Sequence, residues 1–180
     1  WTATGAQTGA GFGFAVASAG DVNHDGFSDI VVGAPYYDLG GTDTGALFLY
    51  YGSAAGPRTP PAATNGPGID GALLGTAVAC AGDINGDQDS EIIAAAGGNT
   101  VVLADAGTVF MYLGGANPFG GGPDWSLAGQ VTGGALGRSV AGLGDINGDG
   151  YDDVAVGDPL YDGAGSDAGR VSVFLGRGLG

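Results

Sequence analysis

The sequence contains almost no positive charge. It has no lysine and four arginines among 180 residues, against 19 aspartates and glutamates, so its formal net charge is −15. Because four arginine side chains cannot neutralise the phosphates of a nucleic-acid backbone, we expect no nucleic-acid partner. Carboxylates in such excess repel one another in a compact fold, and bound cations would relieve that repulsion. The charge balance therefore points to metal ions.

Cysteine and long hydrophobic runs are also scarce. The single cysteine, Cys80, cannot form an internal disulfide, so cysteine usage does not identify the redox compartment. The longest uncharged apolar stretch, residues 71–82, is interrupted by glycine and is too short to span a bilayer, so no membrane insertion is expected. No signal peptide is visible and no initiating methionine is present, as expected of a segment excised from a longer chain.

Glycine, in contrast, is abundant, with 41 glycines against 8 prolines. The glycines follow no three-residue period, which excludes a collagen-like chain. A hydrophobic content of 44% predicts a folded protein rather than a disordered one. We therefore expect a fold with many tight turns.

An internal repeat organises the chain. The segments GDVNHDGFSD, GDINGDQDSE and GDINGDGYDD place their first aspartates at Asp21, Asp83 and Asp145, so both spacings are 62 residues. The same offset superimposes other positions without a gap, and Trp1 falls on the phase of Trp125. The sequence therefore predicts one segment of three units, residues 1–62, 63–124 and 125–180.

Each unit has the periodicity of β-strands. In the first unit, residues 12–18, 29–33 and 46–51 are rich in β-branched and aromatic residues, and turn residues separate them. A weaker fourth strand is expected at each unit boundary, at residues 1–4 and 125–128, so that neighbouring units exchange a strand. The prediction is an all-β chain of blades with four antiparallel strands each.

Blades of this kind bury both faces when they pack around an axis, as in a β-propeller. Closed propellers typically contain about four to eight blades, so three are too few. We expect either a part of a larger propeller or two copies that close a six-bladed ring as a homodimer. The chain begins with a fourth-strand segment and ends with a third-strand segment at residues 171–175, and these are complementary.

Each aspartate-rich loop places oxygen ligands at positions 1, 3, 5, 7 and 9. Calcium prefers six to eight oxygen ligands, and a tightly curled loop with this alternation surrounds it. Glycine at position 6 suits the curl. In the first and third loops the predicted ligands, with a backbone carbonyl at position 7, are Asp21, Asn23, Asp25, Phe27 and Asp29, then Asp145, Asn147, Asp149, Tyr151 and Asp153.

The second loop departs from this pattern because Gln88 stands at position 6. The expected ligands are nevertheless Asp83, Asn85, Asp87, the carbonyl of Asp89 and Glu91. The missing glycine favours a lower affinity, whereas the extra charge of Asp89 favours a higher one. None of the loops is an EF-hand, because position 12 is apolar in all three. The alternative is that the loops are Asp/Asn/Gly turns that bind no metal.

The first unit resembles a known family. Gly11-Phe12-Gly13, the aspartate-rich loop and Gly33-Ala34-Pro35 are similar to the FG-GAP repeat of integrin α-subunits and their bacterial relatives. The resemblance implies propeller blades with one Ca²⁺ in each of the three loops, on the ligands named above. The other units depart from it at Leu74-Gly75, Leu136-Gly137, Ala95-Ala96-Gly97 and Gly157-Asp158-Pro159.

These features favour a module for extracellular or cell-surface adhesion that recognises a protein or a glycan, in which calcium is structural. We do not expect an enzyme, because the chain has one histidine, no lysine and no nucleophile with a base partner in a known motif. Two alternatives stay open: a non-catalytic propeller portion of a secreted hydrolase, and a structural repeat fragment that assembles with itself.

Overall fold

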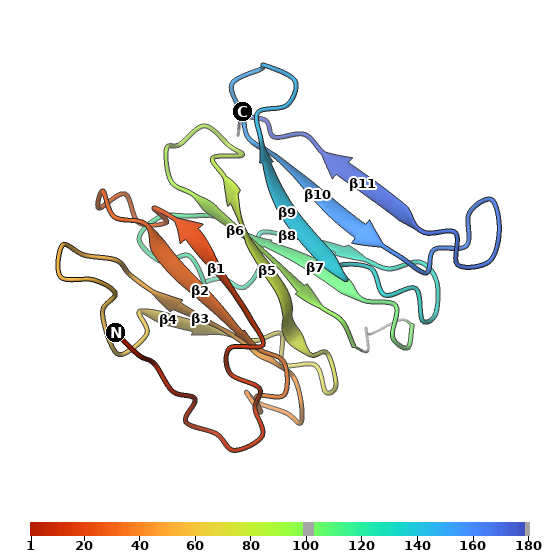
Figure 1. The fold of residues 1–180 in the computed structure, drawn as a ribbon, viewed down its shortest axis with the longest axis horizontal. Coiled ribbons are helices and arrows are strands. Elements are labelled where there is room, and N and C mark those ends of the chain that lie inside the picture. The colour runs from red at the N-terminus through yellow and green to blue at the C-terminus, as the bar shows by residue number, and fades with distance from the viewer. Residues whose placement is uncertain (99–102, 179–180) are drawn as a thin grey trace.

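The computed structural model describes residues 1–98 and 103–178, which contain eleven strands and no helix (Figure 1). The strands recur with the 62-residue offset of the sequence. Their bounds are β1 (Ala15–Gly20), β2 (Asp29–Ala34), β3 (Ala46–Tyr50), β4 (Ala63–Asn65), β5 (Leu74–Gly82), β6 (Glu91–Ala96), β7 (Thr108–Tyr112), β8 (Trp125–Ala128), β9 (Ser139–Gly144), β10 (Asp153–Asp158) and β11 (Arg170–Phe174).

The strands form three antiparallel sheets, here called blades 1, 2 and 3. Blade 1 has the order β1-β2-β3-β4, blade 2 the order β5-β6-β7-β8, and blade 3 the order β9-β10-β11. The blades follow one another across the molecule in chain order and do not close on themselves (Figure 1). The prediction of an all-β chain of propeller blades is confirmed.

The outermost strand of a blade comes from the following 62-residue unit. β4 pairs with β3 and β8 pairs with β7, each after a connection that leads out of one unit and into the next. The first strands, β1, β5 and β9, lie beside one another in that order. Each blade therefore extends outward from a shared row of first strands.

The hydrophobic core lies between the blades. At the junction of blades 1 and 2, Leu47 and Leu49 belong to one buried cluster with Ile92 and Tyr112. A second cluster at the next junction contains the neighbour of Ile92, Ile93, which points to the opposite face of the sheet. All six residues of β6 are therefore buried, since blade 2 is covered on both faces.

The backbones of neighbouring blades approach closely where two glycines meet. A side chain at Gly33 in β2 would overlap the carbonyl oxygen of Gly75 in β5, so only glycine fits there. At the next junction Ala95 replaces the first glycine, and its methyl group faces Gly137. The Gly-Ala-Pro segment of blade 1 therefore meets Leu74-Gly75 of blade 2, which has the phase of Phe12-Gly13.

Two strand predictions need correction. The first strand begins at Ala15 rather than Phe12. In blade 2 the strand begins at Leu74, in the phase of Phe12, where Leu74 pairs with Ala96 and bridges to Gly45 of the neighbouring blade. Residues 1–4 form no strand. A strand needs a partner for its backbone groups, and β3 and β7 already pair with β4 and β8. Residues 1–4 therefore lack the third strand beside which a fourth would form.

Candidate metal sites

The three aspartate-rich loops lie next to one another. Each loop connects the first and second strands of its blade, at residues 21–29, 83–91 and 145–153. The amide of Ser90 donates to the carbonyl of Asp21 (2.9 Å), and 62 residues later the amide of Asp152 donates to the carbonyl of Asp83 (3.0 Å). The predicted ligands of the three loops are thus gathered along one edge of the molecule.

Each loop curls around its first aspartate. The carboxylate of Asp21 accepts hydrogen bonds from the amides of Asp25 (3.0 Å) and Gly26 (2.8 Å). Asp83 and Asp145 accept the corresponding bonds from positions 5 and 6 of their own loops. These bonds hold the pKa of the Asp145 carboxyl below its usual range. Position 1 therefore organises the curl.

Positions 3, 5 and 7 are tied to one another in the same way. The side-chain oxygen of Asn23 accepts from the amide of Asp25 (3.2 Å), and Asp25 accepts from the amide of Phe27 (3.1 Å). The other loops repeat both bonds. The alternating polar pattern of the sequence therefore reflects a chain of side-chain to backbone bonds that fixes the loop.

Position 6 requires a left-handed backbone, as the sequence predicted. Gly26, Gln88 and Gly150 have φ of 85°, 75° and 93°. A side chain is disfavoured in this region because its Cβ crowds the following carbonyl. Gln88 thus carries backbone strain that the two glycines avoid.

The carboxylate at position 9 is buried in every loop and has a role that the sequence reasoning missed. Asp29 accepts from the amide of Val22 in its own loop (3.0 Å) and from that of Gly52, just after the third strand (2.8 Å). The same two bonds reach Glu91 and Asp153. A glycine in the same phase after each third strand, Gly52, Gly114 and Gly176, was the available signal.

Burial makes two of these carboxylates, Glu91 and Asp29, costly to ionise. It raises the pKa of Glu91 to about 8, although backbone hydrogen bonds oppose the rise. The pKa of Asp29 is also raised, mainly by burial. In the second loop, Oδ1 of Asp89 is buried without a hydrogen-bond partner, 3.4 Å from Nδ1 of the exposed His24. A cation in the loop would offset this concentration of negative charge.

The donor chemistry suits calcium, although the ligands do not converge on a site. Within residues 1–98 and 103–178, no three His, Cys, Asp or Glu side chains form a group that could hold a metal ion. The loop oxygens instead accept backbone hydrogen bonds. Each loop still offers three carboxylates, an amide oxygen and a carbonyl, and a carboxylate oxygen that accepts one bond keeps a further lone pair. Calcium binding at these residues stays a prediction.

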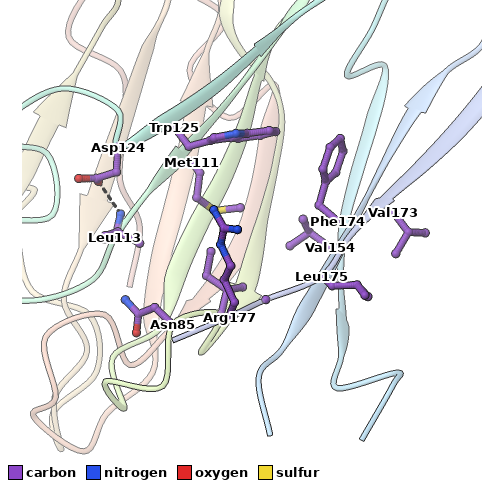
Figure 2. Close-up of a pocket in the computed structure, with 12 residues that line it drawn as sticks. Asn85, Met111, Leu113, Asp124, Trp125, Val154, Val173, Phe174, Leu175 and Arg177 are labelled. Carbon is purple, nitrogen blue, oxygen red and sulfur yellow. Dashed lines mark hydrogen bonds between the residues drawn. The ribbon is translucent and has the colours of Figure 1, made fainter. Parts of the chain in front are cut away.

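A pocket of about 570 Å³ lies elsewhere, between blades 2 and 3. Trp125 of β8 and Phe174 of β11 flank it with ring centroids 5.2 Å apart, and Arg177 reaches in from the segment after β11 (Figure 2). Its lining is mainly apolar and contains no cysteine or histidine. The chain's cysteine, Cys80, lies in β5, and burial raises the pKa of its thiol.

No helix among the described residues is long and apolar enough to cross a membrane.

The FG-GAP repeat model matches residues 12–50 and 136–174. Each match begins at the residue before Gly13 or Gly137 and ends at the last residue of a third strand. The two matches lie two repeat units apart. The second unit lies outside both ranges. It is the unit with Gln88 in the loop and Ala95-Ala96-Gly97 at the end of its second strand.

Several integrin α-subunits are similar to most of the chain. Integrin alpha-6 of Homo sapiens is 37% identical over 148 residues, which are 81% of this chain and 12% of that protein. Integrin alpha-6 of Gallus gallus is 36% identical over 171 residues, or 92% and 14%. Integrin alpha-4 of Xenopus laevis is 35% identical over 170 residues, or 90% and 16%. The chain thus spans a small part of the length of these relatives.

Proposed function

Because this chain belongs to the FG-GAP repeat family, we propose that it is a calcium-stabilised propeller module without enzymatic activity. It would recognise a protein or a glycan outside the cell or at the cell surface, with calcium in a structural role. The similarity to integrin α-subunits supports the module type. The composition and geometry of the aspartate-rich loops support the proposed calcium binding.

The observation that carries the proposal is that one loop geometry occurs three times, each time with a buried carboxylate at position 9. Asp29, Glu91 and Asp153 are at most 1% exposed, and each stands in a loop with at least two further aspartates. Calcium would bring positive charge to carboxylates that now accept only neutral amide bonds. The residues that would hold it are positions 1, 3, 5, 7 and 9 of each loop.

Calcium would also act on the whole molecule. Three bound Ca²⁺ would change the formal charge from −15 to −9. Each ion that binds only the folded state stabilises it by about 2.7 kcal/mol when calcium is present at 100 times its dissociation constant. The adjacent loops would then form a rigid edge, and rigid loops are suited to recognition.

The proposal is tested by titrating metal-stripped protein with calcium chloride in a calorimeter and by measuring thermal unfolding with and without calcium. We expect up to three ions per chain and a melting temperature that rises by tens of degrees. Asp25→Ala, Asp87→Ala and Asp149→Ala should each remove one binding equivalent. The control is Asp105→Asn, which removes one exposed acid outside the loops and should change neither quantity.

A melting curve that ignores calcium, together with no heat of binding, would show that the loops are only turns. Calcium-dependent turnover of generic esterase, phosphatase or glycosidase substrates would contradict the non-enzymatic assignment. For recognition, a glycan array and a panel of immobilised extracellular-matrix proteins should show binding that disappears on chelation. Failure to bind either panel would oppose the recognition role without affecting the calcium assignment.

A further inference from the structure

We infer that the three aspartate-rich loops bind calcium cooperatively, because a single peptide group links each loop to the one before it. The inference rests on the proposed calcium binding and adds how the three sites would act on one another. Loop 1 is residues 21–29, loop 2 is residues 83–91 and loop 3 is residues 145–153.

One peptide group lies at the junction of loops 1 and 2. It joins Asp89, at position 7 of loop 2, to Ser90, at position 8. Its N–H donates to the carbonyl of Asp21 in loop 1 (2.9 Å), and its carbonyl is the predicted position 7 ligand of loop 2. A peptide group is planar and rigid, so its two ends cannot turn independently. The orientation of this ligand is therefore tied to loop 1.

The same arrangement recurs at the junction of loops 2 and 3. The peptide group between Tyr151 and Asp152 donates its N–H to the carbonyl of Asp83 (3.0 Å), and its carbonyl is the predicted position 7 ligand of loop 3. In both cases the accepting carbonyl belongs to position 1, whose carboxylate organises the curl of its own loop. One hydrogen bond thus connects position 7 of a loop to position 1 of the preceding loop.

The side chain at position 7 also lies against the preceding loop. Oδ1 of Asp89 lies 3.4 Å from Nδ1 of His24, which stands at position 4 of loop 1. At the next junction, a Cβ on Gly86, at position 4 of loop 2, would lie 2.7 Å from the ring of Tyr151. Position 7 therefore contacts position 4 of the preceding loop at both junctions.

A third connection comes from the segment after β7. The amide of Gly114 donates to Glu91, the position 9 carboxylate of loop 2 (3.4 Å), and the amide of Gly115 donates to the carbonyl of Val22 in loop 1 (2.7 Å). Both bonds recur 62 residues later, in blade 3. Two consecutive residues thus hold two loops in a fixed relation.

These links favour positive cooperativity. A loop that holds an ion must fix its oxygen ligands, which costs conformational entropy. Because neighbouring loops share a peptide group, ordering one loop lowers the cost of ordering the next. A carbonyl that faces a cation also makes the N–H of its own peptide group a stronger donor, which strengthens the bond to the preceding loop. Coupling between sites is reciprocal and typically amounts to about 5- to 150-fold in affinity.

Repulsion between bound ions acts in the opposite direction. A loop that has bound calcium is less negative, so it attracts a second ion to its neighbour less strongly than an empty loop does. Dissolved salt weakens this repulsion between exposed charges. The sign of the coupling in salt therefore shows which effect is larger, and we expect the links to outweigh the repulsion.

The first test follows individual loops by NMR while the metal-free protein is titrated with calcium chloride in about 0.15 M sodium chloride. The amides of Gly26 and Gly150 report on loops 1 and 3, because each donates to position 1 of its own loop. Asp87→Asn weakens binding in loop 2 but keeps an oxygen for the amide of Asp89. The calcium concentration at the midpoint should then rise by about 5-fold or more at both glycines.

The matched control is Asp25→Asn, which makes the corresponding change in loop 1. Loop 2 lies between loops 1 and 3, as their strands β1, β5 and β9 do. Asp25→Asn should therefore change the midpoint at Gly150 by less than about twofold, as expected of a site that is not adjacent.

A second variant tests the route of the coupling. Oδ2 of Asp152 accepts a hydrogen bond from the amide of Asp83 (3.0 Å), which adds a bond between loops 2 and 3. Asp152→Ser removes this acceptor from position 8, which supplies no predicted ligand. In this background, Asp87→Asn should shift the midpoint at Gly150 by less than it does in the parent protein, whereas its effect at Gly26 should be unchanged.

A calorimetric comparison leaves the coupled loops unaltered. In Asp149→Asn, loops 1 and 2 keep their sequence and are adjacent, whereas in Asp87→Asn the two unaltered loops are not adjacent. The calcium titration of Asp149→Asn should give the higher Hill coefficient. Equal Hill coefficients for the two variants would contradict the coupling.

The outcomes separate this inference from the calcium proposal. If the loops bind calcium but Asp87→Asn leaves the midpoints at Gly26 and Gly150 unchanged, this inference fails and the calcium proposal stands. Midpoints that fall would show that repulsion between the ions outweighs the links, which also overturns the inference. If no loop of the parent protein responds to calcium, the calcium proposal fails and this inference fails with it.

Discussion

At position 6 the second loop has Gln88, whereas the other two loops have glycine, and Gln88 is therefore the strained position of this loop. Its φ of 75° lies in the left-handed region, where a side chain costs about 1 kcal/mol relative to glycine. We predict that Gln88→Gly raises the free energy of unfolding of the metal-free protein by about 1 kcal/mol. Urea denaturation followed by circular dichroism would measure the change.

The matched control is the reverse substitution in the third loop, Gly150→Gln. Gly150 has a φ of 93°, and a Cβ there would meet no atom within 4 Å, so the substitution isolates backbone strain from packing. It should lower the free energy of unfolding by a similar amount. Equal stability of Gly150→Gln and the parent protein would disprove the strain argument.

The raised pKa of Glu91 predicts that the free energy of unfolding of the metal-free protein falls as the pH rises. Burial raises its pKa from 4.5 to about 8, so the folded state holds a proton that the unfolded state releases between these values. The stabilisation of the folded state by protonated Glu91 is complete below pH 4.5 and is lost as the pH rises to about 8. Denaturant unfolding at intervals across this range should show a falling contribution that Glu91→Gln abolishes, while a contribution that rises with pH would contradict the assignment.

At this scale the sequence predicts part of the site and misses part. The alternation of Asp21, Asn23 and Asp25 identifies the residues that organise the loop, because side chains two residues apart bond to nearby amides. The hydrogen bond that the amide of Gly52 donates to Asp29 joins residues that are distant in sequence. It depends on how the third strand returns past the loop, which local spacing does not encode.

Among the elements, β10 and β11 carry a charged pair that the other blades lack. Asp158 pairs with Arg170 in the strand register, and Oδ2 of Asp158 lies 3.1 Å from the guanidinium. The guanidinium also lies 3.8 Å from the ring centroid of Tyr161. In blade 1 the same cross-strand position joins Ala34 and Ala46. The pair is therefore dispensable for the blade architecture.

Removing one partner of this pair should be worse than removing both. Asp158 is 2% exposed, so Arg170→Ala leaves a buried carboxylate without its counter-charge and should cost about 3 kcal/mol of unfolding free energy. The double variant Asp158→Ala/Arg170→Ala reproduces the pair of blade 1 and should recover most of that loss. A double-mutant cycle by urea denaturation measures both values, and simple additivity would refute a coupled pair.

The antiparallel strands of each blade were predictable because every unit repeats the alternation of apolar and polar residues, although blade 3 has three strands rather than four. The strand bounds were less predictable, since β5 begins at Leu74, which bridges to Gly45 of the neighbouring blade, whereas β1 begins only at Ala15. Residues 1–4 share the composition of β8 but form no strand, because strand formation depends on a neighbour as well as on the segment itself.

For the whole molecule, the charge of −15 predicts a strong response to salt. In the metal-free protein, self-repulsion lowers stability, and salt screens it over about 10 Å at 0.1 M. The melting temperature should rise between 10 and about 500 mM sodium chloride. With calcium bound the rise should be smaller, and a salt response of equal size in both states would oppose metal binding at the loops.

The overall architecture followed from the repeat, whereas the packing between blades did not. Three units at constant spacing predict three sheets. That Gly33 meets Gly75, and that Ile92 and Ile93 face different junctions, depends on how neighbouring sheets are placed. The sequence marks these positions only as small or apolar.

The exchange of the fourth strand has a consequence for synthesis on the ribosome. β3 ends at Tyr50, but its neighbour β4 begins at Ala63, in the next unit. Blade 1 is therefore three-stranded until that later segment has emerged, and its outer edge is exposed to other nascent chains in the meantime. Translation speed across residues 51–65 thus sets how long each new molecule carries an unprotected edge.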